Sequence, residues 1–262
     1  MPMNGKTVIF LHIPKAAGTT MRYILRNNYP WRECLEVKNV TRSDRYFIRM
    51  DRMSRRRRLS VVMGHFGYGI HKYIHGDFQY LTMLRDPVQR VISIYFFILR
   101  KKDHRLHQAV TSRHMSLEEF IDSELSAYIN NLQTRLLSAV DGRFPLKYIP
   151  DDIGAVELAR AKANLAENIS AAGIAEQFDE SLIQFKKTFG WKDIRYLPLN
   201  VTTDKNMDIP EHAIEKIVDN NRYDLELYEF ARELMRGRIQ SYNGNFEHDL
   251  RAFRELNAGR RR

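Results

Sequence analysis

Short runs of apolar residues alternate with longer amphipathic segments along most of the chain. Runs of this length are typical of buried strands, and apolar residues three or four positions apart are typical of helices. The alternation predicts an α/β fold, a mainly parallel sheet covered by helices on both faces. The expected strands are 8–11, 59–63, 78–84, 171–175 and 194–197, with 34–40 as a strand or an irregular segment, and the expected helices are 21–28, 43–53, 88–102, 116–120, 127–140, 156–168, 178–189, 210–220 and 224–238.

The first apolar run leads into a short loop of small residues. Pro14 ends the strand because it has no N–H to donate, and a helix is expected soon afterwards. Gly18 lets the backbone approach a ligand, while Lys15, Thr19 and Thr20 supply a charge and hydroxyl donors. Two interpretations stay open: a phosphate cradle, or an ordinary turn with Thr20 as N-cap. The Walker A pattern places Lys directly before Ser or Thr; here Lys15 precedes the glycine, which argues against an ATP-binding kinase.

A histidine follows the strand expected at 59–63. Gly64-His65 begins a loop over 66–72 that is rich in glycine and aromatic residues, and we expect this loop to be mobile or closely approached by a ligand. Ligands of open α/β sheets bind at the carboxyl ends of strands, and histidine titrates near working pH. His65 is therefore a candidate general base. The alternative is that its ring only bonds a neighbouring backbone group.

The strand expected at 78–84 ends at Arg85-Asp86-Pro87, and Pro87 suits the first turn of a helix. Ser93 follows two turns into that helix. An arginine at a strand end and a serine on the next helix predict a second phosphate clamp. The alternative is that Arg85 pairs with Asp86 or Asp103.

Three other polar stretches have open interpretations. The polar residues of 130–135 either face a site or lie on a helix surface. The run 55–58 consists of four arginines, which is either a solvated helix end or a patch that binds a polyanion. The three histidines at 104, 107 and 114 lack Cys or a carboxylate at ligand spacing, so we expect no metal there.

Composition narrows the class of protein. A length of 262 residues fits one domain, 1–262, with a flexible tail over about 255–262. The net charge of +10 indicates an acidic partner: a nucleotide, an anionic glycan, a nucleic acid or a membrane surface. Cys34 is the single cysteine, so an intrachain disulfide is excluded and a reducing compartment fits. Because the sequence contains neither a signal-peptide pattern nor a transmembrane segment, we expect a soluble cytoplasmic protein. The sequence does not indicate an oligomeric state.

Several motifs together resemble those of the carbohydrate sulfotransferases, in particular the group that contains heparan sulfate 2-O-sulfotransferase and its bacterial relatives. The resemblance covers about residues 6–235 and implies a P-loop-like three-layer fold. The motifs are 14–20 (PKAAGTT), Gly64-His65, 85–95 (RDPVQRVISIY), 131–135 (NLQTR), 173–181 (GIAEQFDES) and 224–228 (DLELY).

The resemblance also implies a sulfuryl donor, 3′-phosphoadenosine 5′-phosphosulfate (PAPS), and no metal. The donor's 3′-phosphate would be held by Arg85 and Ser93. His65 would be the catalytic base, and Lys15 would stabilise the leaving group. The 5′-phosphosulfate would be held by Lys15 and by the backbone and hydroxyls of Ala17, Gly18, Thr19 and Thr20. The loop departs from many relatives in having Ala16-Ala17, which should be tolerated. No counterpart is visible of the long basic acceptor surface or of the Golgi anchor of animal relatives.

We expect the acceptor to be a carbohydrate or glycan, including anionic ones, and a bacterial surface or exported glycan precursor is the favoured class. Candidate acceptor contacts are Tyr68, His71, Lys72 and Arg135. One alternative is a nucleotide-dependent phosphotransferase, which would need Asp86 to bind magnesium. The other is a basic nucleic-acid-binding protein; because the sequence contains no RNA- or DNA-binding motif, we expect no nucleic-acid partner.

Overall fold

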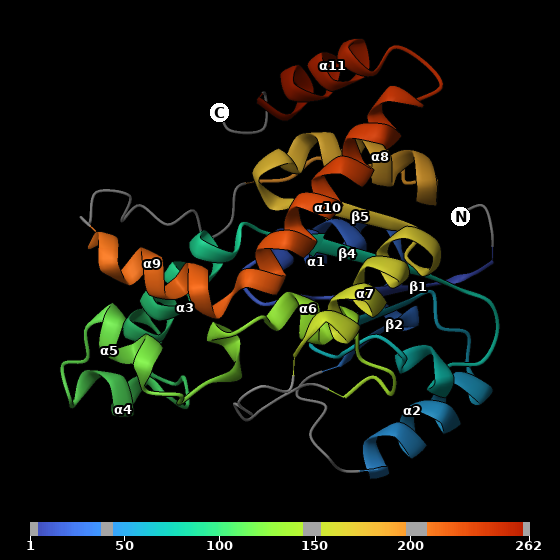
Figure 1. The fold of residues 1–262 in the computed structure, drawn as a ribbon. Coiled ribbons are helices and arrows are strands. Elements are labelled where there is room, and N and C mark those ends of the chain that lie inside the picture. The colour runs from blue at the N-terminus through green and yellow to red at the C-terminus, as the bar shows by residue number, and fades with distance from the viewer. Residues whose placement is uncertain (1–4, 38–43, 144–152, 198–208, 259–262) are drawn as a thin grey trace.

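The computed structural model describes residues 5–37, 44–143, 153–197 and 209–258, and five parallel strands form its central sheet (Figure 1). The strand order is β2-β3-β1-β4-β5, and each neighbouring pair is parallel. The predicted parallel sheet is therefore confirmed. The strands are β1 (Thr7–Leu11), β2 (Cys34–Val37), β3 (Val61–Gly64), β4 (Phe78–Leu84) and β5 (Ala171–Ile174).

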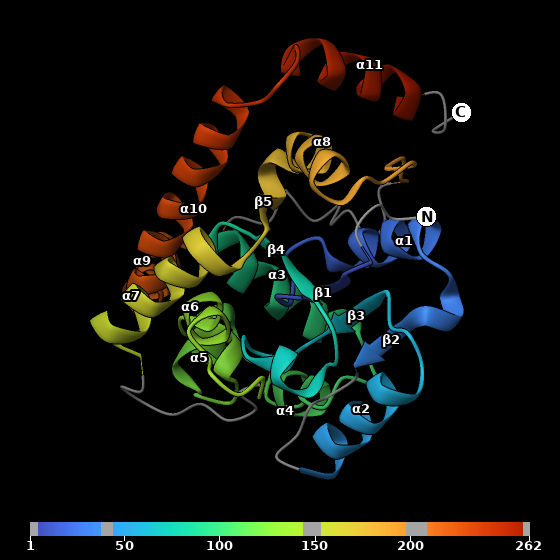
Figure 2. The ribbon, with the colours of Figure 1, turned by 90° about the vertical axis from the view of Figure 1, so that its right-hand side faces the viewer.

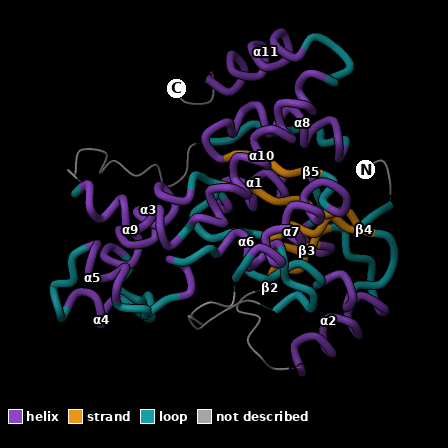
Figure 3. The backbone as a smooth tube through the Cα atoms, in the orientation of Figure 1, coloured by secondary structure: helices purple, strands orange, loops and turns teal. Residues whose placement is uncertain are grey.

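Helices cover both faces of this sheet, as the sequence predicted. Figure 2 shows α1 and α8 on one side, with α6, α7 and α10 on the other, and Figure 3 shows the strands enclosed by helices. Within the described residues, no helix has the length and apolar composition needed to cross a membrane. The helices are α1 (Gly18–Asn28), α2 (Asp44–Arg56), α3 (Pro87–Arg100), α4 (His107–Thr111), α5 (Leu117–Asp122), α6 (Leu132–Leu137), α7 (Ala155–Ala163), α8 (Phe178–Phe189), α9 (Glu211–Asn220), α10 (Arg222–Gln240) and α11 (Phe246–Ala258).

The strand register brings three loops together at one edge of the sheet. Leu11 at the end of β1 lies beside Gly64 of β3 and Thr82 of β4. Because parallel strands end at the same edge, the segments that follow β1, β3 and β4 begin next to one another. His65 and Arg85, far apart in sequence, therefore start from neighbouring positions.

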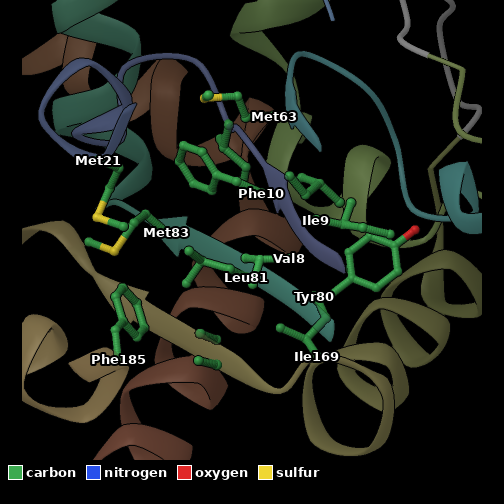
Figure 4. Packing of buried hydrophobic residues seen from close by; sticks show 14 of the residues in the cluster. Val8, Ile9, Phe10, Met21, Met63, Tyr80, Leu81, Met83, Ile169 and Phe185 are labelled. Atoms are coloured by element: carbon green, nitrogen blue, oxygen red, sulfur yellow. The ribbon is translucent and has the colours of Figure 1, made fainter. Parts of the chain in front are cut away.

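The main core fills the space between the sheet and its helices. Figure 4 shows Met21 of α1 and Phe185 of α8 packed beside Met83 of β4, while Tyr80 of the same strand lies beside Ile9. Successive side chains of a strand point to opposite faces, which explains this separation. Met21, Met83, Phe185, Tyr80 and Ile9 are all buried, so both faces of the sheet contribute to the core.

Some predicted elements differ from those observed. α1 begins at Gly18 with Ala17 as its N-cap, rather than after Thr20. The segment 194–197 is not a strand: Tyr196 donates its N–H to the Asn257 side chain at 2.8 Å instead of pairing with a neighbouring strand. α11 was not predicted, and it continues to Ala258 through the first residues of the expected flexible tail. The parts of the predicted segments at 38–40, 43 and 259–262 lie outside the described residues.

The predicted helix 127–140 is broken at Asn131, which adopts a left-handed conformation with φ of 41°. Its side-chain oxygen accepts the N–H groups of Tyr223 and Asp224, each at 3.0 Å, at the start of α10. In return, the Asp224 carboxylate accepts the N–H groups of Gln133 and Thr134 at the start of α6, at 3.0 and 2.7 Å. The two helix starts therefore cap each other, which satisfies donors that lack intrahelical partners.

The same carboxylate lies near a fully buried arginine. Asp224 Oδ2 is 3.7 Å from Arg90 Nη2, and neither side chain is exposed to solvent. Arg90 Nη1 also donates to the carbonyl of Tyr128 at 2.7 Å. Asp224 thus compensates the buried charge of Arg90 and also caps α6. Its removal would leave Arg90 without a counter-charge and the first N–H groups of α6 without an acceptor.

Replacement of Asp224 is therefore expected to destabilise the fold strongly. We expect Asp224→Ala to lower the free energy of unfolding by about 3–5 kcal/mol, because Arg90 would stay buried without its counter-charge. Urea denaturation followed by circular dichroism measures this change. As a control, Glu229→Ala removes an exposed partner of Arg232 and should cost less than about 1 kcal/mol. Similar small losses in both variants would contradict the role given to Asp224.

Candidate active site at the carboxyl edge of the sheet

The segment 14–20, which follows β1 and includes the start of α1, has a backbone shape suited to binding an anion. We call this segment the cradle. Lys15 and Ala17 both adopt left-handed conformations, with φ of 68° and 55°. Each costs about 1 kcal/mol or more for a residue with a side chain, so the packing around the loop must maintain the shape. Ala17 is the N-cap of α1 and makes no side-chain cap bond. The first N–H groups of α1, which include those of Thr19 and Thr20, have no carbonyl partner within the helix and are suited to an anion.

His12 explains why the helix begins with glycine. The buried imidazole of His12 lies so close to Gly18 that a Cβ on Gly18 would be 1.5 Å from His12 Nε2. The same ring stacks on Phe10, with centroids 5.4 Å apart, and lies 4.3 Å from the ring of His65. Gly18 is thus needed for the packing of His12, and approach of its backbone to a ligand stays a prediction.

His65 is fixed by the loop itself. Its Nδ1 lies 2.9 Å from the carbonyl oxygen of His12. Because a carbonyl can only accept, Nδ1 carries the hydrogen, and in the neutral ring the lone pair is then on Nε2. Burial lowers the pKa of His65 below its ordinary value, against a smaller opposing effect of this hydrogen bond. A neutral imidazole with Nε2 as acceptor is the form that a general base requires.

Lys15 lies in a cationic and partly desolvated setting. Burial, together with the nearby charges of Arg85 and Arg100, lowers the pKa of Lys15 to about 8. Its ammonium nitrogen lies 4.2 Å from the ring centroid of Phe97 on α3. Three cations so close together repel one another, and a bound anion would relieve that repulsion.

Arg85 connects the cradle to three other elements. Its Nη1 donates to the carbonyl of Lys15 at 3.0 Å, and its Nε lies 3.8 Å from a carboxylate oxygen of Glu176. Its backbone exchanges two bonds with the Gln133 side chain of α6, at 3.0 and 2.9 Å. Glu176 in turn accepts the hydroxyl of Tyr228 on α10 at 2.8 Å. The predicted alternative, a pair with Asp86 or Asp103, is not what the structure contains.

Ser93 and Asp86 lie on or beside α3. Ser93 is buried and stands one helical turn before Phe97, so both face the loop side of the helix. Asp86 is the N-cap of α3 and accepts the N–H of Gln89 at 2.8 Å. Its carboxylate is thus engaged in capping α3.

One of the predicted acceptor contacts, His71, lies away from His65. His71 stacks on Phe78 at 4.5 Å and its Nδ1 lies 3.1 Å from the hydroxyl of Tyr80, while Tyr68 packs on both His71 and Tyr80. Phe78 starts β4, whereas His65 follows the far end of β3, about 13 Å away along the strands. The structure therefore does not bring His71 and His65 together. Lys72 is exposed in the turn η2 (Ile70–Tyr73) beside His71.

Arg135, the fourth predicted acceptor contact, belongs to α6. Its side chain is buried, and the same helix holds Arg85 through Gln133. The polar residues 131 and 133–135 are therefore buried rather than exposed on a helix surface, and Asn130 is half-buried. Whether Arg135 contacts an acceptor stays a prediction.

Sequence reasoning missed three contributors. His12 stands directly after β1, and a histidine at a strand end was a usable signal. Glu176 and Tyr228 belong to motifs that the resemblance included, but their contact with Arg85 depends on tertiary structure. Among the described residues, no group of three or more His, Cys, Asp or Glu is arranged to hold a metal.

Comparisons with known proteins identify the class. A model of the sulfotransferase family matches residues 4–231, and the chain belongs to this family. It is thus a sulfotransferase, an enzyme that transfers sulfuryl groups.

Two curated relatives and one solved structure illustrate the similarity. Human heparan-sulfate 6-O-sulfotransferase 1 is 27% identical over 91% of this chain and 68% of the relative. Human heparan-sulfate 6-O-sulfotransferase 3 is 29% identical over 62% of this chain and 39% of the relative, so the match spans less than half of that protein. A sulfotransferase from Alicyclobacillus acidocaldarius aligns with a TM-score of 0.47 and 17% identity, over 86% of this chain and 94% of that one. The motifs had indicated the group of the 2-O enzyme, whereas these curated relatives are 6-O enzymes.

The lowered pKa of Lys15 predicts a pH dependence of anion binding. An anion beside the ammonium group raises its pKa, so that above pH 8 binding must take up a proton. We expect the Kd for 3′-phosphoadenosine 5′-phosphate, measured calorimetrically, to be constant from neutral pH to pH 8. Above pH 8 it should rise by up to about tenfold per pH unit. Lys15→Arg keeps its charge over this range and should remove the rise. A rise of equal slope in both proteins would assign it to another group.

Proposed function

We propose that the protein transfers the sulfuryl group of PAPS to a hydroxyl of a glycan, with His65 as general base and Lys15 stabilising the leaving group. The observation that carries this proposal is the bond from His65 Nδ1 to the carbonyl of His12. This bond assigns the ring hydrogen to Nδ1 and the basic lone pair to Nε2, and the ring belongs to a site whose loop is shaped and charged for an anion.

The residues of the cradle fit the donor. Lys15 and the helix-start groups of Ala17, Gly18, Thr19 and Thr20 would hold its 5′-phosphosulfate. Arg85 and Ser93 would hold its 3′-phosphate. Arg85 is partly exposed, and its carboxylate partner Glu176 lies at 3.8 Å, beyond close hydrogen-bond distance, which leaves the guanidinium able to bind a phosphate.

The acceptor must lose a proton as it attacks. The hydroxyl oxygen forms a bond to sulfur while its proton passes to Nε2 of His65. The bond between sulfur and the oxygen of the 5′-phosphate breaks, and 3′-phosphoadenosine 5′-phosphate leaves. Because burial lowers the pKa of His65, the ring is neutral at pH 7 and ready to accept this proton.

Negative charge grows on the oxygen that leaves sulfur. Lys15, protonated below pH 8, would stabilise this charge together with the N–H groups at the start of α1. The partly desolvated setting of Lys15 strengthens the interaction, and the left-handed conformation of the loop fixes it before the reaction. The stabilisation is larger in the transition state than in the bound donor, as rate acceleration requires.

A glycan acceptor is supported by the relatives, which are named as heparan-sulfate sulfotransferases. The net charge of +10 favours an anionic glycan over a neutral one. Arg135 is the acceptor candidate that shares a helix with Gln133, the partner of Arg85. Tyr68 and Lys72 are further candidates, and His71 would contact only an acceptor long enough to extend toward the start of β4.

The competing phosphotransferase proposal would use Asp86 to bind magnesium. Asp86 already caps α3 through its side chain, which weighs against that role.

Loss of His65 should abolish transfer while keeping donor binding. We expect His65→Ala to lower the rate of sulfate transfer from PAPS to a heparan-type glycan by at least about 10²-fold, because the acceptor proton would lack its base. The Kd for 3′-phosphoadenosine 5′-phosphate should stay near the wild-type value. His248→Ala, at an exposed histidine of α11, is the matched control and should be fully active. Near wild-type transfer by His65→Ala would exclude this residue as the base.

Arg85 should distinguish nucleotides with and without a 3′-phosphate. We expect Arg85→Ala to weaken binding of 3′-phosphoadenosine 5′-phosphate by about 1.5–3 kcal/mol, roughly 10- to 150-fold in Kd. Adenosine 5′-phosphate should lose much less, because it lacks the group that Arg85 would contact. Arg236→Ala, at an exposed arginine of α10, serves as the arginine control. Equal losses for both nucleotides would mean that Arg85 acts only by supporting the carbonyl of Lys15.

A further inference from the structure

A cationic surface lies near the amino ends of β2 and β3, whereas the candidate active site lies at the carboxyl ends of the strands. It joins the turn η1 (Trp31–Glu33), just before β2, to the arginine run that ends α2 and precedes β3. Ser60 donates its N–H to the carbonyl of Glu33 at 2.9 Å, and Arg57 Nη1 donates to the carbonyl of Arg32 at 3.1 Å. We call this surface the arginine patch; it consists of Trp31, Arg32, Arg55, Arg56, Arg57 and Arg58.

The position of the patch follows from the parallel sheet. β2 and β3 pair from Cys34 and Val61 onward, so the segments that enter these strands must lie side by side. Figure 2 shows β2 and α2 as neighbours. The dipole of α2 accounts for arginines at its last two positions. It does not account for Arg57, Arg58 and Arg32, which the sheet brings to the same place.

The patch is cationic with little internal compensation. Asp51 pairs with Arg55 at 3.1 Å and with His75 at 2.9 Å, and the Glu33 carboxylate bonds the hydroxyl of Ser60. Arg32, Arg56, Arg57 and Arg58 are exposed and form no ion pair with a carboxylate in the described part of the chain. Such a surface attracts sulfate or carboxylate groups, which guanidinium binds with two parallel hydrogen bonds.

Trp31 adds a second kind of contact. Its side chain is 75% exposed, which is unusual for the largest apolar residue, and Arg32 lies 5.5 Å from its ring. An exposed aromatic face offers packing for the C–H groups of a sugar ring, and adjacent guanidinium groups offer partners for that sugar's anionic substituents. The combination fits an anionic saccharide better than a lipid surface, because Trp31 is the one apolar side chain of the patch.

We propose that the arginine patch binds an anionic polysaccharide, as an anchor for a part of the acceptor chain remote from the hydroxyl that is sulfated. This inference rests on the proposed function for the identity of the acceptor. The eleven residues of α1 separate the cradle from the patch, a length of about 16 Å. A single sugar cannot reach both places, so the acceptor is a polymer.

The two tryptophans allow a direct test. Trp191 is 3% exposed and its indole N–H donates to the Tyr29 hydroxyl at 2.9 Å, so the neutral quencher acrylamide should act mainly on Trp31. A heparin oligosaccharide is the probe. We expect it to protect Trp31 from acrylamide in the full-length protein. Trp31→Phe should keep most of the affinity for the oligosaccharide measured by calorimetry, and Trp31→Ala should reduce it.

Charge-matched variants distinguish heparin binding at the arginine patch from attraction by the overall positive charge of the protein. Arg56→Ser/Arg58→Ser should weaken heparin binding by roughly three- to tenfold, because two exposed ionic contacts are lost. Arg236→Ser/Arg251→Ser removes two exposed arginines of α10 and α11 and should change binding less than about twofold. Equal effects of the two double variants, or no protection of Trp31, would overturn the proposal.

Two further measurements complete the test. An oligonucleotide or anionic vesicle of matched charge that displaces heparin from Trp31 at lower concentration would overturn the choice of a polysaccharide. Titration with 3′-phosphoadenosine 5′-phosphate in the same preparation separates this inference from the proposed function. Nucleotide binding without protection of Trp31 would reject the patch alone. Protection of Trp31 without nucleotide binding would support the patch and reject the sulfotransferase donor.

Discussion

The polarity of one backbone loop organises the candidate site. Two carbonyl groups of the loop after β1 face the functional side chains: His12 accepts from His65 at 2.9 Å, and Lys15 accepts from Arg85 at 3.0 Å. The N–H groups that follow, at the start of α1, face the place where an anion would lie. The left-handed conformations of Lys15 and Ala17 let the carbonyl groups and the N–H groups of this segment point in these two different directions. In the proposed mechanism, the loop therefore orients the base and a phosphate-binding arginine with the same backbone that would bind the anion.

The two arginines of the segment 85–95 have different surroundings. Arg85 is partly exposed and reaches the cradle, whereas Arg90 is fully buried and meets Asp224. Asp224 also caps α6, whose Gln133 holds the backbone of Arg85. Motifs separated by more than a hundred residues thus form one connected support for the strand end. This connection gives a physical reason why the stretches near 85, 131, 173 and 224 recur together in the motif pattern.

The sequence predicted the parts of the fold that depend on local pattern. β4 was predicted with its observed bounds, because its apolar run is long and is followed by Arg85-Asp86-Pro87. The places where the structure departs from the predicted elements depend on tertiary contacts. Nothing local in the predicted helix 127–140 shows that Asn131 caps a distant helix, and 194–197 resembles a strand but has no strand to pair with. α11 was missed although its buried residues 246, 250, 253 and 257 follow helical spacing.

The candidate site was predictable in its residue types and less so in its arrangement. Lys15, His65 and Arg85 stand at strand ends, where their chemistry could be inferred. The contact between His12 and Gly18 and the link from Arg85 to Glu176 arise only when the strands and helices assemble. The bond that selects the tautomer of His65 is likewise a tertiary contact. His71 belongs to the same glycine- and aromatic-rich stretch as His65, yet the loop carries it toward the start of β4.

The most direct test of this account is calorimetric titration of the purified protein with 3′-phosphoadenosine 5′-phosphate and with ATP, both without magnesium. The cradle, its cations and Arg85 predict tight binding of the 3′-phosphorylated nucleotide and weak binding of ATP. A preference for ATP, or binding that requires magnesium, would contradict the assignment of the loop to a sulfuryl donor.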